Sequence, residues 1–497
     1  MSTPESHPSS GTTQPRTSSL LDVWSPPGGA YFAGRWQQTG ATMPVTDPED
    51  GSVLGHVAEC SSAQVSAAVA GVAASAADDD WPVWARKEAL HRAAGLVEHE
   101  AEKFARIIST EGVKTITEAE REVDRCAETL RLSADASAYL TGETIGFDAS
   151  PRGGGRVGWF SREPVGVVAA ITSYNDPLNL VAHKLGPALM GGNGVVLKPS
   201  GYTPYTALAF VELLLRAGVP PRRVAVVCGG AATGQALVSE PRIAVVSFTG
   251  GPATAARITA VAGPRKMLME LGGNNATIVC ADADLSTAAE AIVAGAFGVA
   301  GQNCLSVQRV YVHSSAYPEL LRLIVGHTRK LTVGSKRDRA TDIGPLVDES
   351  AARRVDDCVY EAVAAGACLH AGGTRTGAYY APTVLTDVRA GARVLTEELF
   401  GPVVTIAPYD DISDAIDAAN DSDYALQAGL FTHSIEDAFA TAARLTCGAV
   451  VVNGTSDLRL DSMPFGGFKG SGIGREGVRY ALEAMTEPKT TIVNLAS

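Results

Sequence analysis

The spacing of apolar residues changes character along the chain. From Glu163 onward, short runs rich in β-branched residues alternate with longer segments whose apolar positions recur at helical spacing. This order predicts parallel strands joined by covering helices, because parallel neighbours require a long crossover connection. The predicted strands span residues 165–171, 195–198, 224–228, 245–248 and 266–270. The predicted helices between them lie near 178–190, 204–217, 232–239 and 252–261.

A second alternating block begins near Ala276. It contains a predicted helix at 284–300, a strand at 309–313, a helix at 316–330, and later segments around 347–366, 412–420 and 435–446. Ahead of both blocks, residues 62–110 and 114–140 are predicted to form long amphipathic helices that cover the first sheet. The pattern therefore predicts an α/β fold with two α/β domains.

Two further strands are predicted apart from these blocks, at residues 155–161 and 490–495. Both fall outside the alternation of strands and helices, so we expect them to pair outside the main sheets. Strand addition between subunits is a common route to closed assemblies. The sequence therefore predicts a homo-oligomer, either a homodimer or a homotetramer.

The composition is that of an ordinary globular protein, with 45% apolar residues in a chain of 497. The formal net charge is -13 and both signs are interspersed, which argues against a nucleic-acid partner. No run of about 20 apolar residues occurs, so no membrane partner is expected. Residues 1–20 are rich in Ser, Thr and Pro and are predicted to form a disordered tail.

The cysteines and glycine-rich motifs narrow the chemistry. Eight cysteines are scattered without a CxxC pair, which favours a reducing cytoplasm and argues against a metal site. Two matches to the dinucleotide fingerprint GxGxxG begin at Gly153 and Gly472. Neither lies between a strand and a helix with a second strand beyond, so neither is predicted to bind a cofactor through this motif.

Three short segments contain chemically useful side chains: SYNDP at 173–177, MELGGN at 269–274 and GQNC at 301–304. Each one alone has an ordinary structural explanation. A lone cysteine is usually a small buried residue, and an Asn before Asp-Pro is usual in turns. The three segments therefore gain meaning only in combination.

In combination they resemble the aldehyde dehydrogenase superfamily, over the chain from about Tyr31 to its end. Cys304 falls where that family keeps its nucleophile, Glu270 on its general base, and Asn175 on its oxyanion-stabilising amide. The resemblance implies oxidation of an aldehyde to a carboxylic acid with NAD or NADP. The intermediates would be a thiohemiacetal and then a thioester on Cys304.

The same resemblance implies a set of cofactor-binding residues. Lys198 falls on the family's adenosine-ribose contact, and Glu398 with Phe400 on its nicotinamide-ribose clamp. Residues 248–252 lead into a predicted helix, whose N-terminal N–H groups would face the phosphates. The full set is Thr172, Ser173, Lys198, Ser200, Gly201, Gly229, Phe248, Thr249, Gly250, Gly251, Leu271, Glu398 and Phe400.

Two residues bear on the reaction subclass and the cofactor. The resemblance implies that relatives releasing acyl-CoA lack a carboxylate at Glu270, so its presence favours hydrolysis to the free acid. Gly201 stands where many NAD-preferring relatives carry Glu, whose charge would repel the 2'-phosphate of NADP. We therefore expect NADP to be accepted and preferred over NAD. The alternatives are a CoA-acylating dehydrogenase and a catalytically silent structural member of the family.

The substrate is indicated less directly. Asp176, Asn179 and His183 recur at helical spacing, so we expect them on the face that meets the substrate; alternatively, they only hydrogen-bond to neighbouring loops. Within the superfamily the sequence most resembles the lactaldehyde and phosphonoacetaldehyde dehydrogenase group. Arg121 and Arg459 are the candidate anion-binding residues. The expected substrate is a small polar or anionic aldehyde.

The resemblance also implies a division into domains. The first block would form a Rossmann-type cofactor-binding domain and the second a catalytic domain. The expected bounds are 21–145 with 165–271 for the cofactor-binding domain, 272–480 for the catalytic domain, and 146–164 with 481–497 for the oligomerisation strands.

Overall fold

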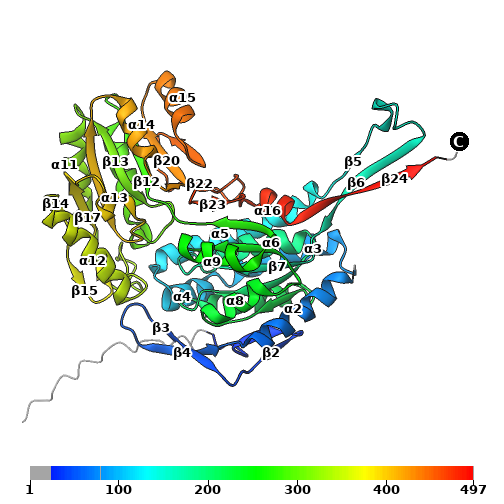
Figure 1. The fold of residues 1–497 in the computed structure, drawn as a ribbon. Helices are drawn as coiled ribbons and strands as arrows, with labels where there is room; N and C mark the ends of the chain where they lie inside the picture. The colour runs from blue at the N-terminus through cyan, green and yellow to red at the C-terminus, as the bar shows by residue number, and fades with distance from the viewer. Residues whose placement is uncertain (1–23, 79, 496–497) are drawn as a thin grey trace, which may run out of the picture.

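The computed structural model describes residues 24–78 and 80–495, so the tail predicted at 1–20 lies outside the described residues. Two large sheets with their covering helices stand next to each other, and a narrow arm of strands projects from them (Figure 1). Within the described residues, no helix is long and apolar enough to cross a membrane.

The first sheet has eight strands within the described residues, in the order β2-β1-β9-β8-β7-β10-β11-β23. Strands β9, β8, β7, β10 and β11 are parallel, which confirms the strands predicted between residues 165 and 270. The chain adds β8 and β9 on one side of β7 and then β10 and β11 on the other, which creates a crevice at the carboxyl ends. The bounds are β1 Ala30–Phe32, β2 Arg35–Gln37, β7 Val167–Ile171, β8 Gly194–Lys198, β9 Val224–Val226, β10 Ile243–Thr249, β11 Lys266–Glu270 and β23 Gly472–Ile473.

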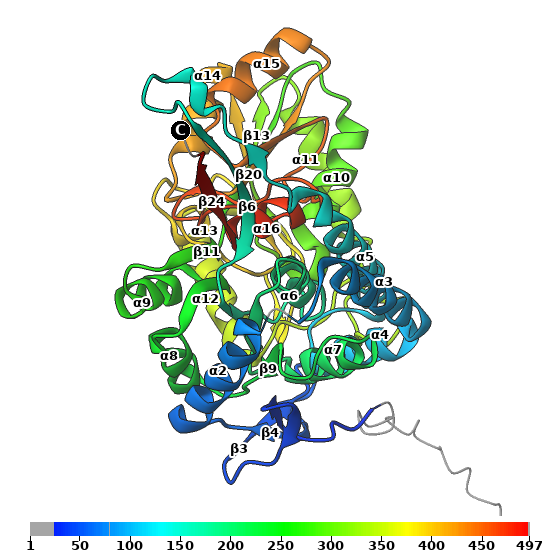
Figure 2. The same cartoon turned by 90° about the vertical axis from the view of Figure 1, so that its right-hand side faces the viewer.

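Alternate residues of each strand enter different cores, because successive side chains point to opposite faces. Val168 of β7 packs among helices α3 to α7, whereas its neighbour Ala169 packs among α2, α8 and α9. The two helix groups lie on opposite sides of the sheet (Figure 2). Their bounds are α2 Ser62–Ala77, α3 Val83–His99, α4 Ala101–Glu111, α5 Ile116–Asp135, α6 Asn179–Met190, α7 Pro204–Arg216, α8 Ala231–Ser239 and α9 Pro252–Ala262.

Helices occupy both ranges predicted as long amphipathic helices, 62–110 and 114–140, but the first range is broken. The first range is divided into α2, α3 and α4, and the second ends as a helix at Asp135, followed by a 3-10 turn at Ala136–Tyr139. Pro82 is the N-cap of α3. Because proline has no N–H to donate and fits only the start of a helix, α2 cannot continue through it.

The second sheet has seven strands within the described residues, in the order β14-β17-β18-β13-β12-β20-β21. All neighbours except β14 and β17 are parallel. The strands are β12 Asn275–Val279, β13 Val307–His313, β14 Cys368–Ala371, β17 Thr383–Thr386, β18 Val403–Tyr409, β20 Gln427–Phe431 and β21 Ala449–Val452. The helices on this side are α10 Leu285–Phe297, α11 Tyr317–Thr328, α12 Glu349–Ala364, α13 Arg393–Thr396, α14 Ile412–Asn420 and α15 Ile435–Arg444.

The strands predicted near 155–161 and 490–495 pair with each other in the projecting arm. Strand β24 (Thr486–Asn494) runs antiparallel to β6 (Arg156–Pro164), which also pairs with the short β5 (Glu143–Thr144). Helix α16 (Val478–Ala484) precedes β24 and packs on α6. Small two-stranded sheets elsewhere are β3 Thr42–Thr46 with β4 Val53–Ala58, β15 Arg375–Thr376 with β16 Tyr379–Tyr380, and β19 Tyr424–Ala425 with β22 Phe468–Lys469.

Candidate active site

The ends of three elements meet where the two sheets face each other. Glu270 is the last residue of β11, Asn175 follows β7, and Cys304 follows a 3-10 turn at Gly298–Gly301 after α10. The carboxyl ends of parallel strands share one edge of a sheet, so the first two residues come from the same edge. The third reaches it from the second sheet.

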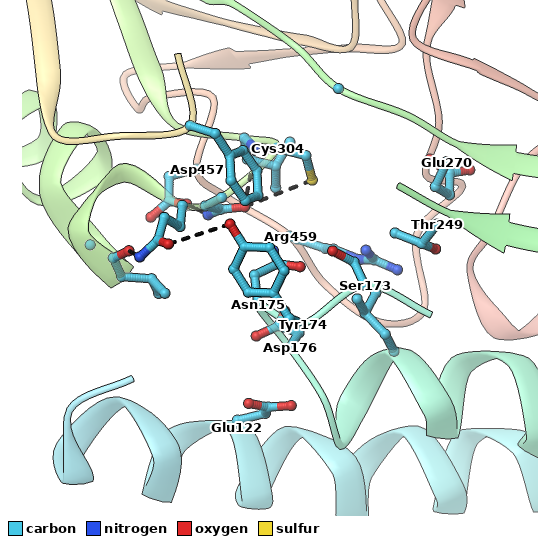
Figure 3. Close-up of a pocket in the computed structure, with 18 of the residues that line it drawn as sticks. Glu122, Ser173, Tyr174, Asn175, Asp176, Thr249, Glu270, Cys304, Asp457 and Arg459 are labelled. Carbon is cyan, nitrogen blue, oxygen red and sulfur yellow. Dashed lines mark hydrogen bonds between the residues drawn. The ribbon is translucent and has the colours of Figure 1, made fainter. Parts of the chain in front are cut away.

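These residues line a cavity of about 540 Å³ (Figure 3). The sequence-predicted site residues that line it are Cys304, Glu270, Asn175, Ser173, Thr249, Gly250, Gly251, Leu271, Glu398, Phe400, Arg121, Asp176 and Arg459. The structure thus brings the predicted nucleophile, base and amide together with both candidate anion-binding arginines.

Cys304 is a partly buried thiol at the cavity wall. Its Sγ lies 3.8 Å from Oδ1 of Asn303, and its main-chain carbonyl accepts a hydrogen bond from Nδ2 of Asn275 at 2.8 Å. Burial raises the pKa of the thiol well above its usual value, while the charge of Arg459 acts in the opposite direction. Burial therefore disfavours the thiolate form of Cys304, and the charge of Arg459 favours it.

Glu270 is buried, and its Oε2 atom has no hydrogen-bond partner among the described residues. Burial, and next the nearby Glu476 carboxylate, raise the pKa of Glu270 well above the usual range. Burial alone would also raise the pKa of Glu476, but the charges of Lys184 and Arg459 lower it to about 2. Of the two adjacent carboxyl groups, Glu476 is therefore the fixed anion and Glu270 the one suited to exchanging a proton.

Asp176 belongs to a network of charged side chains in the cavity wall. It accepts a hydrogen bond from Nζ of Lys114, which also donates to Glu122 at 2.7 Å. Nη1 of Arg125 lies 3.6 Å from its Oδ2. Burial alone would raise the pKa of Asp176, but the two cations lower it. Its negative charge is therefore balanced within the protein.

Asn179 and His183 do not line the cavity, so the expectation that they face the substrate is corrected. Each is 1% exposed. Nε2 of His183 lies 2.7 Å from Oδ1 of Asp461, and Oδ1 of Asn179 accepts a hydrogen bond from Thr129 at 2.9 Å. The start of α6 is buried against α5, which turns both side chains into the protein and matches the alternative of purely internal hydrogen bonds.

The two candidate arginines differ in their surroundings. Arg121 is exposed at the cavity, and within the described ranges it forms no hydrogen bond or ion pair. Arg459 donates to Oε2 of Glu476 at 3.1 Å and lies over the Phe465 ring, 3.9 Å from its centre. Its buried Nε atom has no hydrogen-bond partner. Both guanidinium groups therefore retain N–H donors.

The remaining predicted cofactor residues lie outside this cavity, at or just beyond the carboxyl ends of the first sheet's strands. Lys198 ends β8, and its Nζ donates only to the carbonyl of Pro199, at 3.2 Å, among the residues described. Burial lowers the pKa of this lysine. The predicted cofactor residues that lie outside the cavity are Thr172, Lys198, Ser200, Gly201, Gly229 and Phe248.

Glu398 and Phe400 line the cavity from the segment between α13 and β18. Oε1 of Glu398 accepts a hydrogen bond from the N–H of Gly273 at 3.1 Å, and burial raises the pKa of Glu398 to about 7. Phe400 has a left-handed backbone with φ of 51°, and its ring packs edge-on against Tyr174.

Sequence reasoning missed five charged residues of the lining: Lys114, Glu118, Glu122, Arg125 and Asp457. Glu118 had a readable signal, because Thr115 and Glu118 have the spacing of a helix-capping box. Asp457 accepts a hydrogen bond from Nδ2 of Asn303. Burial, and next the negative charge of Asp176, raise the pKa of Asp457 to about 7. Neither Lys114 nor Asp457 lies in a segment whose local pattern marks it.

Comparison with known proteins decides the family. A model described as "Aldehyde dehydrogenase family" matches residues 36–491. The chain belongs to the aldehyde dehydrogenase family. It is an oxidoreductase that uses NAD(P), as the resemblance in the sequence implied.

Two curated relatives and one solved structure illustrate the position of this aldehyde dehydrogenase. It is 44% identical to aspartate-semialdehyde dehydrogenase 1 of Pseudomonas canavaninivorans, over 91% of this chain and 96% of the relative. It is 43% identical to 3-sulfolactaldehyde dehydrogenase of Priestia aryabhattai, over 94% and 98%, in agreement with the predicted likeness to lactaldehyde dehydrogenases. NADP-dependent glyceraldehyde-3-phosphate dehydrogenase of Bacillus halodurans, solved with NADP, has a TM-score of 0.92 and 36% identity, over 94% and 99%.

The strand ends of this aldehyde dehydrogenase fit a dinucleotide. Gly251 is the N-cap of α9, and a Cβ on it would meet open space, so the first N–H groups of the helix are accessible to a phosphate. A side chain at position 250 would displace Phe248, because the Phe248 ring lies 2.6 Å from where the Cβ of that side chain would be. The cation of Lys198, without an acidic partner among the described residues, supplies the complementary charge.

Proposed function

We propose that this chain oxidises a small aldehyde bearing an anionic group to the carboxylic acid, through a thioester on Cys304. The observation that carries the proposal is the composition of the 540 Å³ cavity, in which Cys304, Glu270 and Asn175 line the same space as Arg121 and Arg459. A nucleophile, a base, an amide donor and two cations are the groups that this reaction requires.

Cys304 attacks the aldehyde carbon and converts it to a tetrahedral thiohemiacetal. The Asn175 side-chain amide and the N–H of Cys304 stabilise the oxyanion, each contributing about 3 kcal/mol. When bound, the nicotinamide supplies a hydride acceptor. Loss of hydride leaves a thioester on the Cys304 sulfur.

Glu270 then removes a proton from the water that hydrolyses the thioester. Burial and the Glu476 carboxylate raise the pKa of Glu270, which makes its ionised form a stronger base. The position of this carboxyl in the cavity supports release of the free acid over the CoA-acylating alternative. A catalytically silent role is disfavoured because the nucleophile, base and amide all line the same cavity.

For the cofactor, we propose NADP in preference to NAD. Thr172, Ser173, Lys198, Ser200 and Gly201 would hold the adenosine end, Gly229 and residues 248–251 the phosphates, and Leu271, Glu398 and Phe400 the nicotinamide end. The support is local charge: Gly201 brings no carboxylate to this edge, and Lys198 forms no ion pair among the described residues. A 2'-phosphate would meet a cation and no repelling anion.

For the substrate, the charge balance favours an anion. Asp176 is neutralised by Lys114 and Arg125, so it does not repel a negative group, and Arg121 remains free to bind one. The relatives named above act on aldehydes that carry a carboxylate, a sulfonate or a phosphate. We propose the same class, an aldehyde of a few carbons with one anionic substituent.

A matrix of steady-state rates tests both assignments. Neutral, hydroxylated, carboxylated, sulfonated and phosphonylated short aldehydes are each assayed with NAD and with NADP, with acid and thioester products quantified in the presence and absence of CoA. We expect the highest kcat/KM for an anionic aldehyde with NADP, and free acid as the product. Highest efficiency with neutral aldehydes would overturn the substrate class, and turnover by a Cys304→Ser variant would overturn the mechanism.

We further propose that the arm joins copies of this chain into a homodimer or homotetramer. Trp159 on β6 and Ile492 on β24 are 45% and 51% exposed, and β21 ends the second sheet with Val452 43% exposed. An apolar arm and an open strand edge are complementary surfaces. Light scattering of a variant lacking residues 486–497 measures whether the assembly depends on β24.

We also propose a cytoplasmic location. All eight cysteines are free thiols, which is usual for proteins of a reducing compartment.

A further inference from the structure

The backbone that leads to Cys304 is held in a strained conformation. After α10, Val299 and Ala300 adopt left-handed dihedrals with φ of 53° and 51°. Such dihedrals bring Cβ close to the backbone, and a β-branched residue there is a genuine outlier. Gly301 follows with φ of 71°, where a Cβ would lie 2.2 Å from the carbonyl oxygen of Gly401.

Side chains from elsewhere hold this turn in place. The N–H of Val299 donates to Oε1 of Glu118 at 2.7 Å, and the carbonyl of Val299 accepts from Nε2 of Gln302 at 3.1 Å. Gln302 is fully buried and accepts from the N–H of Val347 at 2.9 Å. Strain of this kind persists only where the surroundings over-determine the conformation. Glu118 is the contact that ties the turn to α5, in the helix layer of the first sheet.

The contact uses a property that only a carboxylate has. Oε2 of Glu118 accepts from the N–H and hydroxyl of Thr115, at 2.9 and 3.1 Å, in the capping box of α5. Helix α2 has the same box with Gln64, whose single Oε1 atom accepts from the N–H of Ser61 at 2.9 Å. One oxygen therefore completes the cap. The second oxygen of Glu118 is what serves Val299, and an amide nitrogen in its place cannot accept.

We infer that Glu118 is a positioning residue. Its hydrogen bond fixes the strained turn Gly298–Gly301 to α5, and the fixed turn orients Cys304 toward the aldehyde carbon. Glu118 acts through the main chain of Val299 and takes no part in the bond-making steps. The inference rests on the role proposed above for Cys304, but the anchoring of the turn is measurable without turnover.

The test is a Glu118→Gln variant beside a Glu120→Gln control. The variant keeps one acceptor for the cap, as in α2, and loses the acceptor for Val299. Glu120 lies on the same helix and, among the residues that the structure describes, pairs with Arg339 alone, at the surface. We expect kcat of Glu118→Gln to fall by about 10- to 100-fold with KM for NADP within about twofold. Amide hydrogen exchange of residues 298–304 in the free enzyme should accelerate by about tenfold. The control should change neither quantity.

A second comparison separates positioning from general stability. Glycine adopts the left-handed region without strain, so in a Val299→Gly background the loss from Glu118→Gln should shrink to less than about threefold. This comparison also stands if the single variant fails to fold. Unchanged kcat in Glu118→Gln, a loss of kcat without faster exchange at 298–304, or an undiminished loss in the glycine background each overturns the inference. Cys304→Ser should abolish turnover while leaving the exchange rates unchanged, which keeps the two proposals distinct.

Discussion

Lys184 donates a hydrogen bond to Oε1 of Glu476 at 2.7 Å, and both side chains are buried. The charge of Lys184, with that of Arg459, keeps Glu476 ionised in a place where burial alone would favour the neutral acid. That fixed anion, added to burial, raises the pKa of Glu270. Lys184 and Glu476 therefore affect the pKa of the proposed base, although neither residue is among those that line the cavity.

Replacing Glu476 by Gln should move the pH profile of turnover. Hydrolysis requires ionised Glu270, so kcat rises as the pH rises through its pKa, and the raised pKa places that rise above the ordinary carboxyl range. Removal of the Glu476 charge lowers the pKa of Glu270 and should shift the acid limb to lower pH. The measurement is kcat between pH 5 and 9, and an acid limb that stays in place contradicts the coupling.

Glu270→Gln should separate the two halves of the reaction. The glutamine cannot deprotonate water, so kcat should fall by about 10²- to 10⁴-fold, while Cys304 still forms the thioester. Rapid mixing should show a burst of reduced cofactor approaching one equivalent per site, followed by slow turnover. A loss of the burst together with turnover would show that Glu270 acts before the thioester forms.

Arg121→Ala should affect only anionic substrates. Loss of one charge-assisted hydrogen bond raises KM for a sulfonated or carboxylated aldehyde by about 10- to 100-fold, with little change for a neutral aldehyde of the same length. Arg131→Ala is the matched control, because Arg131 lies on the same helix but pairs with Glu98 away from the cavity. Equal effects on neutral and anionic aldehydes would contradict anion binding by Arg121.

Gly201→Glu should turn the cofactor preference towards NAD. A carboxylate beside the 2'-position repels the phosphate of NADP, and kcat/KM with NADP relative to NAD should fall by about tenfold or more. Gly201→Ala controls for the added volume, since a Cβ there meets only the flexible end of Met43, at 2.9 Å. A wild-type enzyme that already prefers NAD would remove the premise.

Asp461→Asn should destabilise the protein by about 1 to 3 kcal/mol at neutral pH, because it removes the charged partner of Arg125 and His183, although Arg125 keeps its longer contact with Asp176. Burial alone would raise the pKa of Asp461, but the hydrogen bond from His183 and the charge of Arg125 hold it far below the usual range. A depressed folded-state pKa contributes stability above about pH 4, which is lost as the pH falls through it. The Tm gap between wild type and variant should therefore shrink in acid, and a gap independent of pH contradicts this account.

The parallel strands of the first sheet could be predicted from the sequence because each is a short buried run with its own local signature. Strand β10, predicted at 245–248, spans Ile243–Thr249. The division of 62–110 into three helices was missed because the helical periodicity continues on both sides of the two breaks, which lie at Pro82 and at Glu100. Local pattern identifies an element more surely than its ends.

The candidate site divides in the same way. The motifs around Asn175, Glu270 and Cys304 identify chemistry by residue type and order, and the structure places all three at one cavity. The direction of Asn179 and His183 was not predictable, because helical spacing gives their common face but not which neighbour covers it.

The sequence by itself determined the α/β class, the succession of the parallel strands of the first sheet along the chain and the residues proposed for the reaction, since these depend on local pattern and motif. Only the tertiary structure decided the charge partners, among them Lys114 with Asp176 and Lys184 with Glu476, which are 62 and 292 positions apart. The physical reason is that a buried charge takes its pKa from whatever packs against it, and packing joins segments whose sequences carry no mark of each other.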